Sequence, residues 1–360
     1  MIMSRRAIRV TTVTAVAALT TAAVPMGAGA QEPPFQVVAE GLDNPRHLTF
    51  SPSGDLLVVE AGSGGSGPCV VHPGGLGTFC VGFSGSVTRV SDRGDEKQVL
   101  TGLPSIQSDQ GETLGPSDIA FQGDNKFVLS VGIGSDVEFR DGFGDDGTLL
   151  GTLVAGKLQR DEFSLFADVL ANEAAANPDG TDIDSNPVGL LRQGNGYVIA
   201  DAGGNAVVRV DNKGTSFSTV TPLPPTGIGA DAVPTSVVKG PDGAFYISQL
   251  TGFPFEPGAA NIWRALPGQA PTVWASGLTN VTDLAFAKDG TLYAVEIASE
   301  GLLNGPIGSL VKVTPGSSEH ETIIGGLFAP YGVALTKNAA YVSTGAVLTG
   351  GGQVIKVPLG

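Results

Sequence analysis

Residues Gly194–Asp211 read GNGYVIADAGGNAVVRVD, and the fold predicted for this chain is built on their pattern. Two apolar segments, Tyr197–Ala200 and Ala206–Val210, are separated by Asp201 and the turn residues Ala-Gly-Gly-Asn. Short β-branched segments separated by turn residues are typical of a β-hairpin. We expect the glycines to supply positive φ angles and the Asp201 carboxylate to accept backbone N–H groups within the turn.

The same pattern recurs in six copies along the chain. Their first strands are expected to begin at Pro45, Pro116, Pro187, Pro234, Val281 and Pro330. Each copy adds a third segment, such as SVTRVS at Ser86–Ser91, and most add a fourth, such as TVWASGL at Thr272–Leu278. Four short strands per repeat predict the blade of a β-propeller, and one short helix is expected at Phe166–Asn177.

The two ends of the chain are expected to share a blade. The sixth copy has no fourth strand, and Phe35–Leu42 (FQVVAEGL) closely matches the fourth strands of the other copies. Pairing of this N-terminal strand with the last copy would remove an exposed sheet edge. We therefore predict an all-β, six-bladed β-propeller with four-stranded antiparallel blades, whose last blade is closed by the N-terminal strand.

The first thirty residues have the three regions of a signal peptide. Three arginines up to Arg9 precede the apolar stretch Val10–Val24, and Ala28–Ala30 is a small-residue cleavage motif. We predict residues 1–30 to be a signal peptide and residues 31–360 to be a single propeller domain. The protein is thus expected to be secreted, with no membrane span. Ser4–Ile8 also resembles a twin-arginine signal, so both export routes stay open.

The chain has two cysteines, Cys69 and Cys80. In an oxidising compartment two such cysteines favour a disulfide. A metal-binding or redox pair is the alternative, but the wide spacing and the lack of further cysteines speak against it.

Composition narrows the function classes. The net charge is −15, and −18 without the first thirty residues, which contain three arginines and no acids. Such a chain repels phosphate backbones, so we expect no nucleic-acid partner. The 53 glycines and 24 prolines disfavour a helical protein, whereas 41% hydrophobic residues suffice for a packed core. We expect a monomer.

The motif Tyr-Val-x-Ala-Asp-x-Gly-x-Asn resembles an NHL-type repeat. More specifically, the chain resembles the secreted ScyD/ScyE family, named after members found in scytonemin biosynthesis clusters. The resemblance is carried by Thr113–Phe121 (TLGPSDIAF), Ala176–Leu191, Val198–Asp211 and Val233–Arg264. It implies a secreted propeller and supplies no catalytic residues.

Most of the extra length is expected on one face of the propeller. The long loops between second and third strands are residues 61–85, 132–155, 250–260 and 297–308, and the long connectors are residues 104–115 and 171–186. These segments all lie on one face of a four-stranded propeller, whereas the opposite face keeps tight turns. Insertions around a channel mouth indicate the binding face.

Polar residues expected at this mouth are the candidate ligand-binding residues. They are Asn44, His47, Glu60, Asp118, Asn186, Asp201, Gln249, Asp283 and Glu296. Capping of turns is the alternative role for the residues that end second strands, namely Glu60, Asp201, Gln249 and Glu296. His47 is either a general base or a structural histidine.

Calcium is the one cofactor that the sequence suggests. Asp179, Asp182 and Asp184 lie in NPDGTDIDSN, and closely spaced carboxylates suit Ca²⁺. The spacing of an EF-hand loop is absent, and solvated turn residues are the alternative.

These observations predict an exported propeller that binds a small molecule or an extracellular surface partner on its loop-rich face, without assigned catalytic residues. The alternative is a calcium-dependent hydrolase of lactonase type with its site at the channel mouth. In the propeller hydrolases that such a site would resemble, Glu, Asn and Asp at the starts of first strands bind the metal. The aligned residues are Arg46, Ser117, Val188, Thr235, Thr282 and Tyr331, none of them a carboxylate or an amide. A shifted register would instead bring Asn44, Asn186 and Asn280, or His47, Asp118 and Asp283, to these positions.

Overall fold

The stretch Gly194–Asp211 forms the predicted hairpin in the computed structural model, which describes residues 34–91 and 93–359. Strand β13 (Gly196–Asp201) pairs antiparallel with β14 (Ala206–Asp211), and both segments are largely buried. Two further strands complete a four-stranded sheet in the order β12-β13-β14-β15.

The turn of this hairpin corrects one expectation. The positive φ angle belongs to Asn205 (+45°) and not to Gly203 or Gly204. A Cβ atom on Gly203 would lie 2.5 Å from Asp184 Oδ1, and one on Gly204 would lie 2.7 Å from Glu173 Oε2. The glycines are therefore required by the close approach of two carboxylates, while the asparagine adopts the left-handed conformation.

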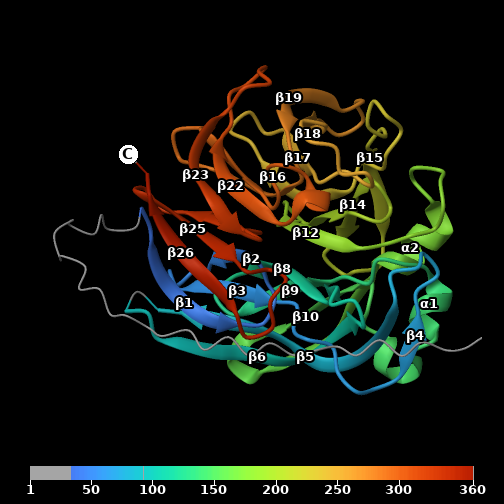
Figure 1. Ribbon diagram of the computed structural model, residues 1–360. Coiled ribbons are helices and arrows are strands. Elements are labelled where there is room, and N and C mark those ends of the chain that lie inside the picture. The colour runs from blue at the N-terminus through green and yellow to red at the C-terminus, as the bar shows by residue number, and fades with distance from the viewer. Residues whose placement is uncertain (1–33, 92, 360) are drawn as a thin grey trace, which may run out of the picture. The chain divides into compact units, whose positions relative to one another are not determined.

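Six such sheets form the blades of a six-bladed β-propeller (Figure 1). Blade 1 contains β2 (Pro45–Phe50), β3 (Leu56–Glu60), β5 (Thr78–Val90) and β6 (Glu96–Ser108), with the short β4 (Cys69–Val71) and β7 (Thr113–Leu114) at its side. Blade 2 contains β8 (Pro116–Gln122), β9 (Lys126–Val131), β10 (Thr152–Lys157) and β11 (Glu162–Asp168). Blade 3 adds β12 (Pro187–Arg192) and β15 (Phe217–Pro222) to the hairpin.

The remaining three blades have the same order of strands. Blade 4 contains β16 (Pro234–Lys239), β17 (Phe245–Gln249), β18 (Ala260–Ala265) and β19 (Thr272–Leu278). Blade 5 contains β20 (Val281–Phe286), β21 (Leu292–Glu296), β22 (Ile307–Lys312) and β23 (Glu321–Phe328). Blade 6 contains β24 (Val333–Leu335), β25 (Ala339–Thr344), β26 (Gly352–Pro358) and β1 (Gln36–Leu42). Five of the six expected starts coincide with a first strand, and the sixth begins three residues after Pro330.

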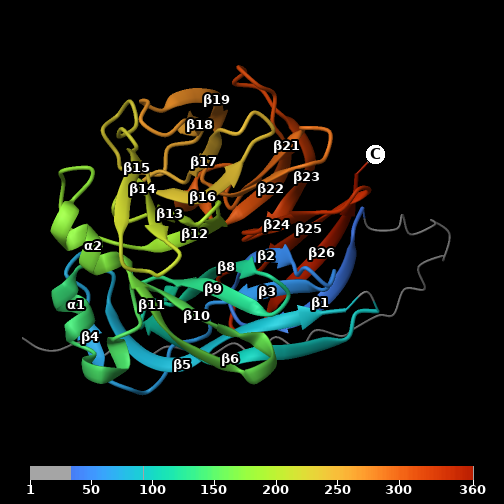
Figure 2. The same ribbon diagram turned by 180° about the vertical axis from the view of Figure 1, so that it is seen from behind.

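Blade 6 is closed as predicted. Strand β1 pairs antiparallel with β26, and Glu40 lies opposite Gln353. Figures 1 and 2 show the blue N-terminal strand beside the red C-terminal one. Pro34–Gly360 form one compact unit. The predicted signal peptide, residues 1–30, lies outside the described residues. No helix in the described part of the chain is long and apolar enough to cross a bilayer.

The hydrophobic core is divided into layers between neighbouring blades. Leu57 of blade 1 packs with Leu129 of blade 2, for example, and Tyr293 of blade 5 packs with Val342 of blade 6. Four more clusters fill the other interfaces between blades. Apolar burial thus joins each blade to the next and leaves the central axis to polar residues.

The helices are short and lie in the long loops and connectors. They are α1 (Val137–Asp141), α2 (Val169–Ala176) and the 3₁₀ turns η1 (Gly144–Gly147), η2 (Leu158–Arg160) and η3 (Leu302–Asn304). The expected helix over Phe166–Asn177 was placed three residues too early. Phe166 belongs to β11 and packs edge-on against Tyr197, and Asp168 caps α2 by accepting the N–H of Ala171.

The disulfide between Cys69 and Cys80 is confirmed. The two residues lie opposite each other on β4 and β5. The bond ties β4, which lies in the long loop between β3 and β5, to the start of β5 on the loop-rich face.

Candidate functional site

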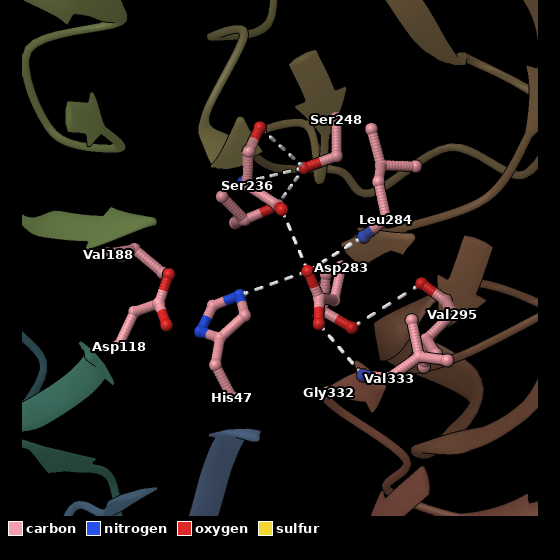
Figure 3. Close-up of polar contacts among 12 residues, drawn as sticks. His47, Asp118, Val188, Ser236, Ser248, Asp283, Leu284, Val295, Gly332 and Val333 are labelled. Carbon is pink, nitrogen blue, oxygen red and sulfur yellow. Dashed lines mark hydrogen bonds and ion pairs between the residues drawn. The ribbon is translucent and has the colours of Figure 1, made fainter. Parts of the chain in front are cut away.

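Polar residues around the central axis connect the blades to one another. The residues two positions after the expected first-strand starts are His47, Asp118, Gly189, Ser236, Asp283 and Gly332. Asp118 Oδ2 accepts the N–H of Leu190 in blade 3 at 2.8 Å. Asp283 accepts the Ser236 hydroxyl of blade 4 at 2.7 Å and the N–H of Val333 in blade 6 at 2.8 Å (Figure 3). These bonds join adjacent blades at the axis.

The two glycines of this set allow direct contact between first strands. A Cβ atom on Gly189 would lie 2.7 Å from the Cα atom of Ser236 in the next blade. A Cβ atom on Gly332 would lie 2.7 Å from the carbonyl oxygen of Arg46. A side chain at either position would push the first strands apart.

His47 lies between the carboxylates of Asp118 and Asp283 (Figure 3). It is 2% exposed, its Nδ1 is 3.2 Å from the carbonyl oxygen of Ser117, and its Nε2 is 3.6 Å from Asp283 Oδ1. Burial raises the pKa of Asp118 to about 6, against the opposing effect of the nearby His47. Burial also raises the pKa of Asp283, and His47 again opposes the shift. Burial and the neighbouring His47 thus act in opposite directions on both carboxyl groups.

The acids that end second strands hold the connectors between blades. Glu60, Asp201 and Glu296 accept the backbone N–H groups of Asp43, Asn186 and Thr279 at 2.7, 2.6 and 2.8 Å, respectively. All three are buried. Asp201 also accepts the N–H of Gly204 at 3.4 Å. This bond within its own turn is longer than the bond to Asn186, so Asp201 mainly holds the connector. Burial raises the pKa of Glu60, and that of Asp201 to about 7.

Gln249 takes the equivalent position in blade 4. Its Oε1 accepts the indole N–H of Trp263 and the backbone N–H of Asn261, each at 3.1 Å. Together with the three acids it forms a set of buried acceptors at strand ends. The bonds of this set are internal to the propeller, which favours a structural role.

A cavity of about 190 Å³ lies at the mouth of the central channel. Its walls come from connectors, first-strand starts and loops between second and third strands, so it opens on the loop-rich face. The polar residues that line it are Asn44, Arg46, Glu112, Thr113, Ser117, Asn186 and Tyr331. Asn44 and Asn186 are thus at the mouth, whereas the other candidates are not among its lining residues.

Arg46 supplies the positive charge of this mouth. Its guanidinium donates to the carbonyl oxygens of Ala346 at 2.6 Å and Thr113 at 2.7 Å, and lies 4.9 Å from the ring centroid of Tyr331. Among the described residues, no carboxylate oxygen lies within 4.0 Å of its nitrogen atoms. Burial lowers the pKa of Arg46, and nearby Tyr331 and Glu112 oppose the shift. A guanidinium has five N–H groups, so donors remain free for a ligand.

Ser117 and Tyr331 complete the polar wall. Ser117 is 5% exposed, and its Oγ makes no hydrogen bond of 3.5 Å or less among the described residues, although the Tyr331 phenol is nearby. Burial raises the pKa of the Tyr331 phenol, and Arg46 and the nearby Ser117 hydroxyl oppose the shift. The Tyr331 ring is held between the guanidinium and the edge-on ring of His47, 5.3 Å away. A buried hydroxyl without a partner is costly and favours an external one.

Three larger clefts lie elsewhere in the described part of the chain, and one of them, of about 410 Å³, is lined by Trp274, Asp289 and Lys312 among others. One of about 790 Å³ separates blades 1 and 2, and one of about 650 Å³ separates blades 6 and 1, both toward the tight-turn face. In the largest cleft, Arg89 pairs with Asp55 at 3.8 Å and the Asp161 carboxylate accepts both the N–H and the hydroxyl of Thr101. The mouth, in contrast, opens on the loop-rich face and contains Arg46 without a carboxylate within 4.0 Å, so we take it as the candidate site.

Two of the three predicted calcium residues, Asp179 and Asp184, lie near the acids Glu173 and Asp201. Among residues 34–91 and 93–359, no three His, Cys, Asp or Glu side chains are placed to hold a metal ion. Asp179 accepts the hydroxyl of Thr181 and the amide of Asn205, and Asp182 is exposed. Asp184 Oδ1 has no hydrogen-bond partner among the described residues, and the calcium site stays a prediction.

Comparisons with solved structures support the fold. The chain is similar to a structural genomics protein of unknown function from Bacteroides thetaiotaomicron (9% identity, TM-score 0.54, covering 90% of this chain and 76% of that one). It is also similar to a gluconolactonase from Xanthomonas campestris (10%, 0.52, 90% and 89%). A virginiamycin B lyase from Staphylococcus aureus is a third such structure (11%, 0.50, 90% and 99%). At these identities the likeness concerns the fold alone.

No model of a known protein family matches this sequence, and no curated protein matches it. The resemblance to the ScyD/ScyE family therefore stays a prediction.

Five polar residues of the mouth are not among the ligand-binding candidates selected from the sequence, namely Arg46, Glu112, Thr113, Ser117 and Tyr331. Arg46, Ser117 and Tyr331 each follow an expected first-strand start by one residue, and that position is the only sequence signal for them. Glu112 and Thr113 lie in a long connector, and no motif marks them as ligand-binding residues.

Proposed function

We propose that this chain is a secreted propeller that binds a small molecule at the channel mouth of its loop-rich face. The observation that carries the proposal is the Arg46 guanidinium, which lines the mouth without a carboxylate partner among the described residues. The unpartnered Ser117 hydroxyl beside it adds a second polar group for a ligand. The Cys69–Cys80 disulfide agrees with an oxidising compartment.

The mouth has the two kinds of surface that a small-molecule site needs. Arg46, Ser117 and Tyr331 can orient a polar group, because their positions are set by contacts with the propeller. Val188 and Ile297 supply apolar wall. A few fixed polar groups in a partly apolar concavity are typical of ligand pockets.

Filling the mouth tests this proposal. Val347 lines the cavity and is 46% exposed, so Val347→Trp should block the mouth without disturbing the core. Leu303→Trp is the matched control, because Leu303 lies on the same face, is 64% exposed and does not line the cavity. A library of small polar metabolites is screened by thermal shift against the original protein and both variants.

Ligands of the mouth should raise the melting temperature of the original protein and of Leu303→Trp, and not that of Val347→Trp. A ligand at 100 times its Kd adds about 2.7 kcal/mol to the free energy of unfolding, which a melting curve resolves. Ligands that stabilise Val347→Trp equally would place the binding site elsewhere and contradict the proposal.

A hydrolase of lactonase type is the second candidate, favoured by the buried His47 between Asp118 and Asp283 below the mouth. His47 Nδ1, however, faces the carbonyl oxygen of Ser117, and the Ser117 hydroxyl has no hydrogen bond to a basic group among the described residues. The donor set does not fit a metal, so we derive no metal-dependent step. Melting with calcium and then with chelator, together with a lactone hydrolysis assay, tests this candidate. Unchanged melting and no hydrolysis would reject it.

A further inference from the structure

Two opposite charges line the mouth without pairing with each other. Arg46 and Glu112 both border the 190 Å³ cavity, and no ion pair within 4.0 Å joins them. Among the described residues, the Glu112 carboxylate has neither a hydrogen-bond partner nor a cation within that distance; only the backbone of Glu112 is bonded, to Ser108. Opposite charges on the wall of one cavity are suited to a ligand that carries both charges.

We propose that the mouth binds a small zwitterion of the amino-acid class, with its carboxylate at Arg46 and its ammonium group at Glu112. The inference rests on the proposed function, because it names the ligand class of the same cavity. The free N–H groups of Arg46 can hold a carboxylate by charge-assisted hydrogen bonds. The Ser117 hydroxyl, which lacks a partner, can donate to a carboxylate oxygen.

The charge of the whole protein favours a zwitterion over an anion. The chain carries −15, and the loop-rich face has many exposed acids, among them Glu138, Asp141 and Asp145. A simple anion would be repelled on its approach to Arg46, and Glu112 would repel it again inside the mouth. A zwitterion has no net charge, so it is not repelled on its approach, and its ammonium group is attracted by Glu112. A simple cation would be attracted by Glu112 and repelled by Arg46.

The size and the wall of the cavity limit the side chain of such a ligand. The cavity has a volume of about 190 Å³, which suits a small molecule. Val188, Ala346 and Val347 line it and offer apolar contact to a short aliphatic side chain.

Calorimetric titration tests the inference with charge-dissected probes. The zwitterions are L-alanine, L-serine and L-valine. Propionate lacks the ammonium group, and L-alaninamide lacks the carboxylate. We expect at least one zwitterion to bind about tenfold or more tightly than both single-charge probes, because each lost charge-assisted bond weakens binding by about that factor.

Glu112→Gln is the decisive variant, because Glu112 is exposed and the change removes charge without volume. Glu112→Gln should weaken binding of the zwitterion about tenfold. Binding of propionate should be unchanged or tighter. Glu256→Gln, an exposed acid of the same face that does not line the mouth, is the matched control and should change neither. Arg46→Gln should abolish zwitterion binding, and its melting temperature shows whether it folds.

If no zwitterion binds more tightly than propionate and alaninamide, or if Glu112→Gln leaves zwitterion binding unchanged, the inference is wrong. If Val347→Trp abolishes binding of a ligand and Glu112→Gln does not affect it, the zwitterion inference is wrong and the proposed function stands. The absence of any ligand sensitive to Val347→Trp would overturn both.

Discussion

Replacing Glu173 by glutamine should stabilise the protein at alkaline pH and leave it unchanged at acid pH. Glu173 lies on α2, is 1% exposed, and its Oε1 has no hydrogen-bond partner among the described residues. Burial raises its pKa to about 8, and Asp201, Asp179 and Asp184 add to the shift. The folded protein therefore holds a proton at Glu173 that the unfolded chain, with an ordinary pKa near 4.5, loses.

The sign of the pH dependence follows from this difference. The stabilising effect of the proton is fully present below about pH 4.5 and is lost as the pH rises through about 8. The full pKa shift would change the free energy of unfolding by about 5 kcal/mol, at about 1.4 kcal/mol for each pKa unit. Relaxation of the connector and entry of water reduce this free energy. We therefore expect Glu173→Gln to be about 2 kcal/mol more stable than the original protein at pH 9, which raises the melting temperature by about 4 °C. Glutamine has the shape of the protonated acid and carries no charge.

Thermal unfolding of the original protein and of Glu173→Gln between pH 4.5 and 9 measures the effect. The difference in melting temperature should be close to zero at pH 4.5 and should grow toward pH 9. Glu319→Gln, at an exposed site, is the control and should show no such trend. A difference that is independent of pH, or a variant that is less stable at pH 9, would refute the reasoning.

Three further changes test the fold. Deletion of residues 35–42 should lower the melting temperature by more than 10 °C or cause aggregation, because it exposes the edge of β26; a truncated protein that melts like the original would contradict closure of blade 6. Replacing Cys69 and Cys80 together by serine should cost about 2–3 kcal/mol in urea unfolding, because the bond closes a short loop, and an unchanged midpoint would argue against this. Gly332→Ala should destabilise the protein by about 1–3 kcal/mol through contact with the first strand of blade 1, whereas Gly227→Ala, with open space around it, should be neutral; equal effects would contradict close contact at the axis.

The fold could be predicted because its information is local and repeated. Each blade carries its own turn residues and β-branched segments, and the match of Phe35–Leu42 to other fourth strands is visible without coordinates. Two local details were wrong. The roles of Gly203 and Gly204 depend on Asp184 and Glu173, which a short pattern does not contain, and the start of α2 depends on the packing of the preceding strand.

The site was harder to predict because the closed ring assembles it from distant segments. Arg46 donates to Ala346, 300 residues away, and to Thr113. No spacing in the sequence indicates that Arg46 and Glu112 border one cavity. Polar residues at strand ends were easier to notice, yet most of them are buried acceptors that hold connectors. Their regular positions reflect the architecture of the blades, whereas the mouth residues follow no repeat.

The position of a bound amino acid in a crystal of the protein tests the central claim most directly. Crystals soaked with the tightest-binding zwitterion should show its carboxylate within hydrogen-bond distance of the Arg46 guanidinium and its ammonium group facing Glu112. Density for the same molecule in the cleft between blades 1 and 2, with an empty channel mouth, would contradict the account.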